Sequence, residues 1–151
     1  MSKKSVFVLI SALSLTIAAA ASAGDTYPGA MCEAYSGSVV VDSNGHIQNN
    51  SSTTWAYVIC PIIGPYNNIS SDPKVFVTDR NAGSNVWCRS VAKNTGTTWY
   101  GSYEYSSGDS SSYQDLEPEA PTATASFTWR YYQCGIPPVD SGASEIRGYR
   151  Y

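Results

Sequence analysis

The residues that could do chemistry in this 151-residue chain are four cysteines, one histidine and twelve acidic side chains. A serine nucleophile needs a base that takes its proton, and His46 is the only imidazole available. His46 directly follows Asn44-Gly45, a pair typical of a tight hairpin turn, so a turn explains its position. The segment GDSSS at 108–112 lacks the strand-to-helix setting of a nucleophile and is typical of a polar loop. We therefore expect no serine-type active site.

Paired carboxylates are the catalytic option that needs no histidine, because glycoside hydrolysis uses two acids. Asp115, Glu117 and Glu119 would share one side of an extended segment, where their oxygens could bind calcium. Two prolines and the preceding serines favour a solvated acidic loop instead. The stretch DSNG at 42–45 has part of a calcium-loop pattern, but its glycine comes too early and a turn is favoured. We expect no catalytic residue, no metal site and no cofactor.

The cysteines are spaced by 28, 28 and 46 positions, which excludes the close pairs of a structural zinc site. In an oxidising compartment two disulfides are the expected use of these four residues: Cys32, Cys60, Cys88 and Cys134.

The first 23 residues, MSKKSVFVLISALSLTIAAAASA, have the charged start, apolar middle and small-residue end of a secretory signal peptide. Cleavage after Ala23 would leave one domain at 24–151, with no further segment able to span a membrane. Lys3 and Lys4 would leave with the signal peptide, so seven basic side chains would face twelve acidic ones. This balance disfavours nucleic acid as a partner. We expect a secreted or periplasmic protein.

The rest of the chain has the residue pattern of β-strands throughout. The segment 38–49 predicts a hairpin around Asn44-Gly45, and 74–79 with 86–92 predicts a second one. Further strands are expected at 97–105, 123–134 and 144–151. Turn residues recur about every 8–12 positions and no 3.6-residue period is sustained. The fold class is therefore all-β: an antiparallel β-sandwich, immunoglobulin-like or jelly-roll-like, with two disulfides.

One heptapeptide pattern occurs twice, as TWAYVIC at 54–60 and TWRYYQC at 128–134. Alternation makes the first copy apolar on both faces, as in a central strand, whereas the second has one solvent-facing side. In an immunoglobulin-like sandwich, two equivalent strands lie in opposite sheets with a cysteine on each. That analogy favours bonding Cys60 to Cys134 and Cys32 to Cys88. The sequential alternative, Cys32 to Cys60 and Cys88 to Cys134, stays open.

Twelve tyrosines and four tryptophans are the clearest surplus in the composition. Alternation in 97–105 places Tyr103 and Tyr105 on one face, with Trp99 and Gly101, and Tyr100 on the other. Exposed tyrosines provide rigid amphipathic contact surfaces, although aromatic residues also serve simply as strand formers and core filler. The candidate ligand-binding residues are Tyr100, Tyr103, Tyr105 and Tyr132.

The order of a cysteine near the mature start, ICP at 59–61, VWC at 86–88, CGIPP at 134–138 and SEIRGYRY at 144–151 resembles small secreted bacterial four-cysteine β-sandwich proteins of uncharacterised function. The resemblance implies the fold and an exported location, and it implies no activity.

These features favour a secreted, non-catalytic binding domain that recognises a glycan or another extracellular protein. Two alternatives remain. One is a structural subunit that assembles through strand edges, with the terminal RGYRY as a donated strand. The other is a carboxylate-dependent glycan hydrolase. The ligand and the oligomeric state are left open.

Overall fold

The computed structural model describes residues 26–63, 73–122 and 129–151. The predicted signal peptide and the first six residues of the strand predicted at 123–134 lie outside the described residues. No helix in the part of the chain that the structure describes has the length and hydropathy needed to cross a bilayer.

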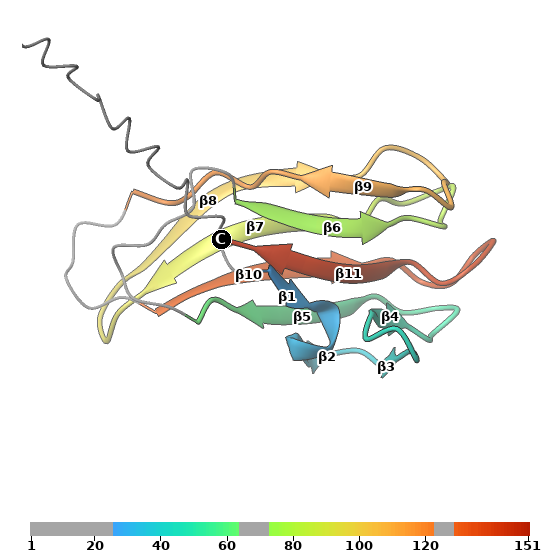
Figure 1. Ribbon diagram of the computed structural model, residues 1–151, viewed down its shortest axis with the longest axis horizontal. Coiled ribbons are helices and arrows are strands. Elements are labelled where there is room, and N and C mark those ends of the chain that lie inside the picture. Colours follow the sequence, from blue (N-terminus) through green and yellow to red (C-terminus); the bar gives the residue numbers. More distant parts are fainter. Residues whose placement is uncertain (1–25, 64–72, 123–128) are drawn as a thin grey trace, which may run out of the picture.

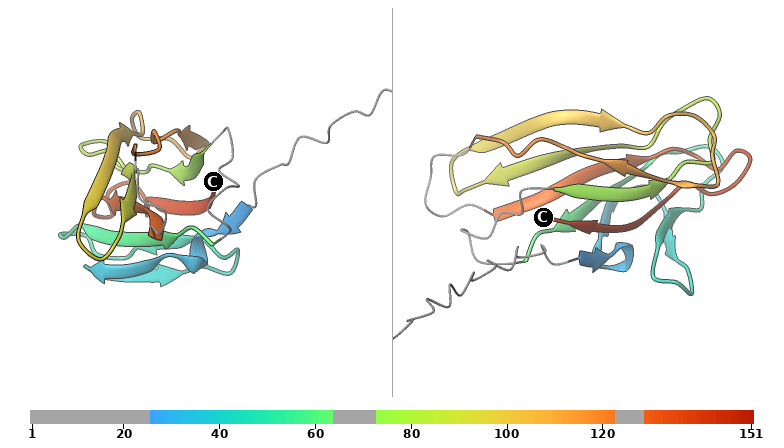
Figure 2. Two further views of the ribbon diagram at one scale, coloured as in Figure 1. Left: turned by 90° about the vertical axis from the view of Figure 1, so that its left-hand side faces the viewer. Right: turned by 45° about the horizontal axis from the view of Figure 1, so that its top comes forward.

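The described chain forms two antiparallel sheets that pack face to face (Figures 1 and 2). Sheet A has the order β3-β4-β11-β6-β9, and β1 also pairs with β11. Its strands are β1 (Thr26–Pro28), β3 (Val39–Val41), β4 (Ile47–Asn49), β6 (Lys74–Thr78), β9 (Tyr113–Leu116) and β11 (Glu145–Arg150). Sheet B has the order β2-β5-β10-β7-β8. Its strands are β2 (Glu33–Ser36), β5 (Ala56–Pro61), β7 (Trp87–Lys93), β8 (Thr98–Tyr105) and β10 (Trp129–Ile136). The expected all-β sandwich is confirmed.

The pairing of the last eight strands is nested. Strand β4 pairs with β11, β5 with β10, β6 with β9 and β7 with β8, so the chain folds back on itself as one long wrapped hairpin. Between β4 and β11 every connection crosses from one sheet to the other except the β7–β8 hairpin. This is the jelly-roll arrangement, one of the two sandwich types that the sequence predicts.

The core lies between the two sheets, where strand alternation brings one face of each together. Fully buried side chains of sheet A, such as Val75, Val77 and Ile146, pack in one cluster with Val58 and Ile136 of sheet B. Alternate residues of both sheets point away from this core and form the two outer faces of the sandwich.

Of the two predicted hairpins, one is confirmed and one is wrong. Strands β3 and β4 pair around Asn44-Gly45, and Gly45 has the positive φ of 81° that this turn requires. The segments 74–79 and 86–92 do not pair, because β6 belongs to sheet A and β7 to sheet B. The corner between them is built on Asp79, a fully buried carboxylate that accepts hydrogen bonds from the Asn81 and Val86 backbone.

Both disulfides differ from the favoured pairing: Cys32 is bonded to Cys60, and Cys88 to Cys134. Cys88 and Cys134 are directly opposite on β7 and β10, and Cys32 immediately precedes β2, which pairs with β5, the strand that carries Cys60. The Cα atoms of each bonded pair are 4.1 Å apart. Cys60 lies opposite Tyr132, and Cys134 lies opposite Val58, so the two cysteines are only diagonal neighbours. Diagonal positions are about 7–8 Å apart, too far for a disulfide, whose Cα atoms are usually no more than about 6.8 Å apart.

The doubled heptapeptide therefore has a different explanation from the immunoglobulin analogy. Its two copies form β5 and β10, which are adjacent antiparallel strands of one sheet rather than equivalent strands of two. The terminal RGYRY is also not a strand available for donation. Residues 145–150 form β11, which lies inside sheet A between β6 and β4, with Tyr149 fully buried.

Candidate functional site

The outer face of sheet B carries a continuous row of aromatic rings. Ring centroids lie 5.1–6.3 Å apart along the series, which is contact range for stacked and tilted pairs. The row crosses the sheet from β2 to β8 and consists of Tyr35, Trp55, Tyr57, Trp87, Tyr103 and Tyr105. We call these residues, together with Tyr100, Arg89 and Gln133, the aromatic face. Its outer tyrosines are about half exposed, with 57% for Tyr105 and 50% for Tyr35.

A β-bulge in β8 brings the third predicted tyrosine onto this face. Arg89 pairs with Tyr103 and Val91 pairs with Tyr100, so three steps along β8 match two steps along β7. The extra residue shifts the alternation by one, and Tyr100 points the same way as Tyr103. The expected placement of Tyr100 on the opposite face is therefore wrong, since plain alternation ignores the bulge.

Gly101 is the residue at the bulge that permits a close approach from another segment. A Cβ atom there would lie 2.5 Å from the Ser90 hydroxyl oxygen and would overlap the Glu119 carbonyl. The Ser90 hydroxyl donates a hydrogen bond to that carbonyl. The backbone of Glu119 therefore lies against the bulge, next to the residue that follows Tyr100.

A second glycine makes the row continuous in the middle of the sheet. Gly135 on β10 lies in register between Tyr57 on β5 and Trp87 on β7. A Cβ atom at Gly135 would lie 2.5 Å from Cε2 of Trp87, so the indole covers the glycine. Aromatic rings commonly cover strand glycines in this way. Trp87 consequently reaches Tyr57, with ring centroids 6.1 Å apart.

Arg89 provides a positive charge at the centre of the aromatic face. Its guanidinium carbon lies 4.0 Å from the Tyr100 ring centroid and 4.8 Å from that of Tyr103. Its Nε and Nη2 donate to Oε1 of Gln133 at 2.8 and 2.6 Å, and Gln133 Nε2 donates to the Tyr35 hydroxyl at 2.6 Å. Within the described residues Arg89 has no carboxylate partner. Its charge is therefore held in place without being neutralised.

Tyr131 lies beside this network on β10. Burial of its hydroxyl, reinforced by the nearby Tyr100, raises the pKa of Tyr131. Tyr132, the next residue, is not part of the aromatic face. It is fully buried, and its hydroxyl donates to the Arg150 carbonyl at 2.8 Å. Alternation along β10 turns Tyr132 inward, so of the four predicted tyrosines three share the surface and Tyr132 belongs to the core.

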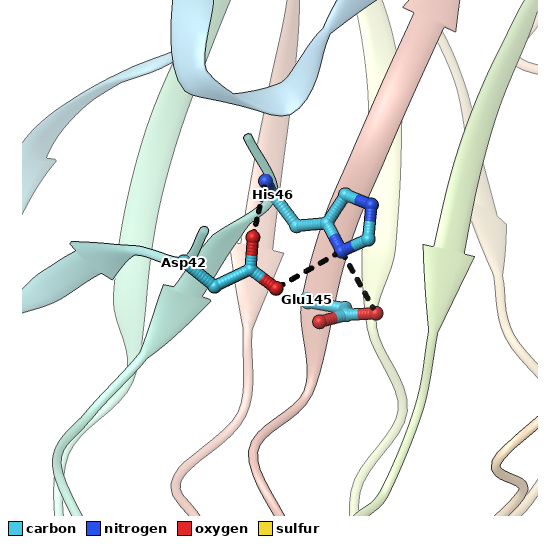
Figure 3. Close-up of side chains that lie close together, drawn as sticks. All are labelled: Asp42, His46 and Glu145. Atoms are coloured by element: carbon cyan, nitrogen blue, oxygen red, sulfur yellow. Dashed lines mark hydrogen bonds and ion pairs between the residues drawn. The ribbon is translucent and has the colours of Figure 1, made fainter. Parts of the chain in front are cut away.

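The outer face of sheet A holds a second cluster, which joins Asp42, His46 and Glu145 (Figure 3). His46 Nδ1 lies 3.2 Å from Asp42 Oδ2 and 3.5 Å from Glu145 Oε1. Asp42 and His46 flank the turn of the β3–β4 hairpin, whereas Glu145 begins β11. All three side chains are largely buried, with exposures of 22%, 13% and 14%.

Both carboxylates in this cluster accept hydrogen bonds from protein donors. The backbone N–H groups of Asn44 and His46 donate to Asp42 Oδ1 at 2.8 and 2.9 Å. The His46 N–H is the main reason that the pKa of Asp42 is lowered. Gln48 Nε2 donates to Glu145 Oε2 at 2.8 Å and more weakly to Asp42 Oδ2 at 3.3 Å. The remaining Glu145 oxygen therefore faces the imidazole.

The cluster lines an open hollow of about 430 Å³. Thr78, which is the register partner of Glu145 on β6, lines the same hollow and is 5% exposed. Its hydroxyl oxygen is buried and has no hydrogen-bond partner among the described residues. Ser111 of the GDSSS segment is also in the wall, but no hydrogen bond within the described chain joins it to His46. The two carboxylates converge on one nitrogen rather than flanking an open slot, as glycosidase acids do.

The acidic segment 115–119, considered above as a calcium site, has a lysine as its partner instead. Lys74 Nζ lies 3.3 Å from Asp115 Oδ2 and 2.9 Å from Glu117 Oε1. The lysine occupies the position between these carboxylates that a cation would take. Glu119 is fastened through its backbone to Ser90 instead.

The cluster around His46 cannot be predicted from the sequence, because Glu145 is 97 residues from Gln48 and still farther along the chain from His46. The DSNG turn contains Asp42 and is followed directly by His46, but nothing in the local pattern indicates which distant acid completes the cluster. Comparison of the chain with protein-family models, curated proteins and solved structures finds no match.

Proposed function

We propose that this protein is an exported, non-catalytic binding domain that holds a glycan chain on the aromatic face of sheet B. The observation that supports the proposal is the continuous row of partly exposed rings with an un-neutralised Arg89 among them. Two disulfides agree with an oxidising compartment outside the cytoplasm.

The composition of the face suits a sugar. Sugar rings present apolar C–H faces that stack on aromatic rings, and hydroxyl groups at their edges that need hydrogen-bond partners. The aromatic face offers both, because Tyr103 and Tyr105 are exposed while Arg89 and Gln133 lie between the rings. Arg89 would favour a glycan that bears carboxylate or sulfate groups.

The length of the aromatic row favours an extended ligand. An extended polymer could contact successive rings from Trp55 to Tyr105 across four strands. Jelly-roll sandwiches include lectin domains, but a fold does not define a function, so the proposal rests on the surface residues.

The proposal is tested by binding to a panel of neutral and acidic polysaccharides in affinity electrophoresis, followed by calorimetry with the retained ones. Tyr105→Ala should weaken binding at least about tenfold, which corresponds to roughly 1.4 kcal/mol. Tyr113→Ala is the matched control, because Tyr113 is 60% exposed but lies on sheet A. Arg89→Met should selectively weaken binding to acidic polysaccharides.

Three results would contradict the proposal. Retention of no polysaccharide, or equal losses for the Tyr105 and Tyr113 variants, would remove the aromatic face as the glycan site. Release of reducing ends from a retained polysaccharide would contradict the non-catalytic assignment.

A further inference from the structure

Three potential ligand atoms converge at the Asp42–His46–Glu145 cluster. His46 Nδ1 lies 3.2 and 3.5 Å from one oxygen of each carboxylate, and all three ligand atoms are within 4.8 Å of one another. A metal ion bonded at about 2.1 Å in tetrahedral geometry holds its ligands about 3.4 Å apart. The spacing around the imidazole nitrogen therefore already matches that of a metal site.

The cluster has the supporting contacts that hold metal ligands in orientation. Asp42 is fixed by two backbone N–H groups on its other oxygen, and Glu145 by the carboxamide of Gln48. Such outer contacts hold the carboxylates in orientation around the imidazole nitrogen and are a usual part of metal sites. Gln48 touches both carboxylates, so it links the two halves of the site.

A proton on the imidazole would satisfy this arrangement only in part. A single Nδ1–H can point straight at one oxygen, whereas two carboxylate oxygens approach the same nitrogen. Arg147 Nε lies 3.7 Å from Glu145 Oε1, but its side chain is 39% exposed, and exposed pairs of this kind contribute little. Thr78 adds an independent sign of a missing partner, since its buried hydroxyl in the wall of the same hollow has none among the described residues.

We propose that Asp42, His46 and Glu145 bind a divalent transition-metal ion of the zinc class on the outer face of sheet A. One imidazole nitrogen and two carboxylate oxygens suit zinc, whereas calcium takes six to eight oxygen ligands. The open hollow of about 430 Å³ beside the cluster leaves room for water to complete the coordination.

The ion would act as a clip between the edge and the centre of sheet A. The β3–β4 hairpin pairs with β11 through only two residue pairs, Glu145 with Gln48 and Ile146 with Ile47. Asp42 and His46 lie in this hairpin and Glu145 lies in β11, so a shared ion would bind the two together. The site is on the opposite sheet from the aromatic face, and the inference is independent of glycan binding.

The test is calorimetric titration of the metal-stripped, disulfide-bonded protein with Zn²⁺, with the melting temperature measured in parallel. Zn²⁺ at a hundredfold excess over its Kd should raise Tm by about 5–10 °C. His46→Ala and Glu145→Gln should each abolish the shift. Gln48→Ala should weaken binding roughly 10–100-fold, as expected for a residue that orients a ligand.

Glu117→Gln is the matched control, because it makes the same chemical change on a carboxylate that pairs with Lys74 outside the site. It should leave the affinity for Zn²⁺ unchanged. Co²⁺ should compete with Zn²⁺ for the site. Once bound, it should show the visible absorption bands of a cobalt ion with a low coordination number. The proposal is overturned if the unaltered protein shows neither heat nor Tm shift with Zn²⁺, if Zn²⁺ binding survives both His46→Ala and Glu145→Gln, or if Ca²⁺ binds and Zn²⁺ does not.

Discussion

The indole of Trp87 lies over the backbone of Gly135, its register partner on the neighbouring strand, and through this position it reaches Tyr57 on the strand beyond. The packing role of Gly135 is therefore to leave room for the Trp87 indole, and this role is not evident from its position inside a strand. Without the space above Gly135 the aromatic row would break into two separate groups, one on β2 and β5 and one on β7 and β8.

Gly135→Ala should displace the Trp87 ring and lower the free energy of unfolding by about 1–3 kcal/mol, because the new methyl group overlaps the indole. Urea denaturation measures the stability, and near-ultraviolet circular dichroism reports the environment of the tryptophans. Gly83→Ala is the control, since a Cβ atom there meets only Asn81 Oδ1 at 3.6 Å. Equal stability of the two variants would show that the indole does not cover Gly135.

Proteolytic peptide mapping of the oxidised protein should find Cys32 linked to Cys60 and Cys88 linked to Cys134. Replacing Cys88 and Cys134 together by serine should cost about 2–5 kcal/mol of stability, because a loop closed by a 46-residue separation is released in the unfolded chain. Denaturation of the double variant measures the loss. A map that links Cys60 to Cys134 would require a different register of β5 and β10.

Asp79→Asn should destabilise the protein by about 2–4 kcal/mol. The carboxylate is fully buried and accepts from the Ser106 and Ser144 hydroxyls as well as from two backbone N–H groups. An amide would place an N–H₂ group against donors and leave them unsatisfied. Asp109→Asn, on an exposed carboxylate 3.9 Å from Arg80, should change stability by less than about 0.5 kcal/mol. Urea denaturation of both variants makes the comparison, and similar losses would mean that the buried corner is not built on Asp79.

Tyr149 should make the fold sensitive to alkali. Burial, with the nearby Tyr27 ring, raises the pKa of Tyr149 to about 12 from its ordinary value of 10.0. Because the folded state holds this proton more tightly, the stabilisation is complete below pH 10 and is lost as the pH rises towards 12. The loss is on the order of 2 kcal/mol.

Tyr149→Phe should flatten this pH dependence while costing about 1 kcal/mol at neutral pH, since the hydroxyl donates to the Pro61 carbonyl at 2.8 Å. Unfolding free energies measured between pH 8 and pH 11 test both effects. Tyr113→Phe, on an exposed ring, should follow the unaltered protein throughout. Identical slopes for all three proteins would contradict the burial of Tyr149 in the folded state.

Local sequence patterns correctly predict several features of the fold. The Asn44-Gly45 turn predicts the β3–β4 hairpin, and alternation in TWAYVIC correctly separates the inward Ala56, Val58 and Cys60 from the outward side chains. These predictions succeed because they depend on contacts within one strand or one turn. Predictions that required strand neighbours, such as the second hairpin and the favoured disulfide pairing, are wrong because nested pairing joins segments that are far apart in the sequence.

The candidate sites divide in the same way. Strand alternation and the tyrosine content identified Tyr103 and Tyr105, but the bulge that turns Tyr100 to their side depends on Gly101 and the distant Glu119. Tyr132 lies in the core because its side of β10 faces sheet A. The residues of β10 do not by themselves indicate which side of the strand faces the other sheet.

The sequence by itself determined an all-β chain with paired thiols and a surplus of aromatic residues, since composition, alternation and turn residues act over a few positions. Only the tertiary structure decided which strands are neighbours, and with them the disulfide partners, the unbroken row of rings across Gly135 and the meeting of His46 with Glu145. Those arrangements arise from pairings such as β4 with β11 and β7 with β10, whose free energy comes from burying the faces of two whole sheets, a quantity that no short stretch of residues contains.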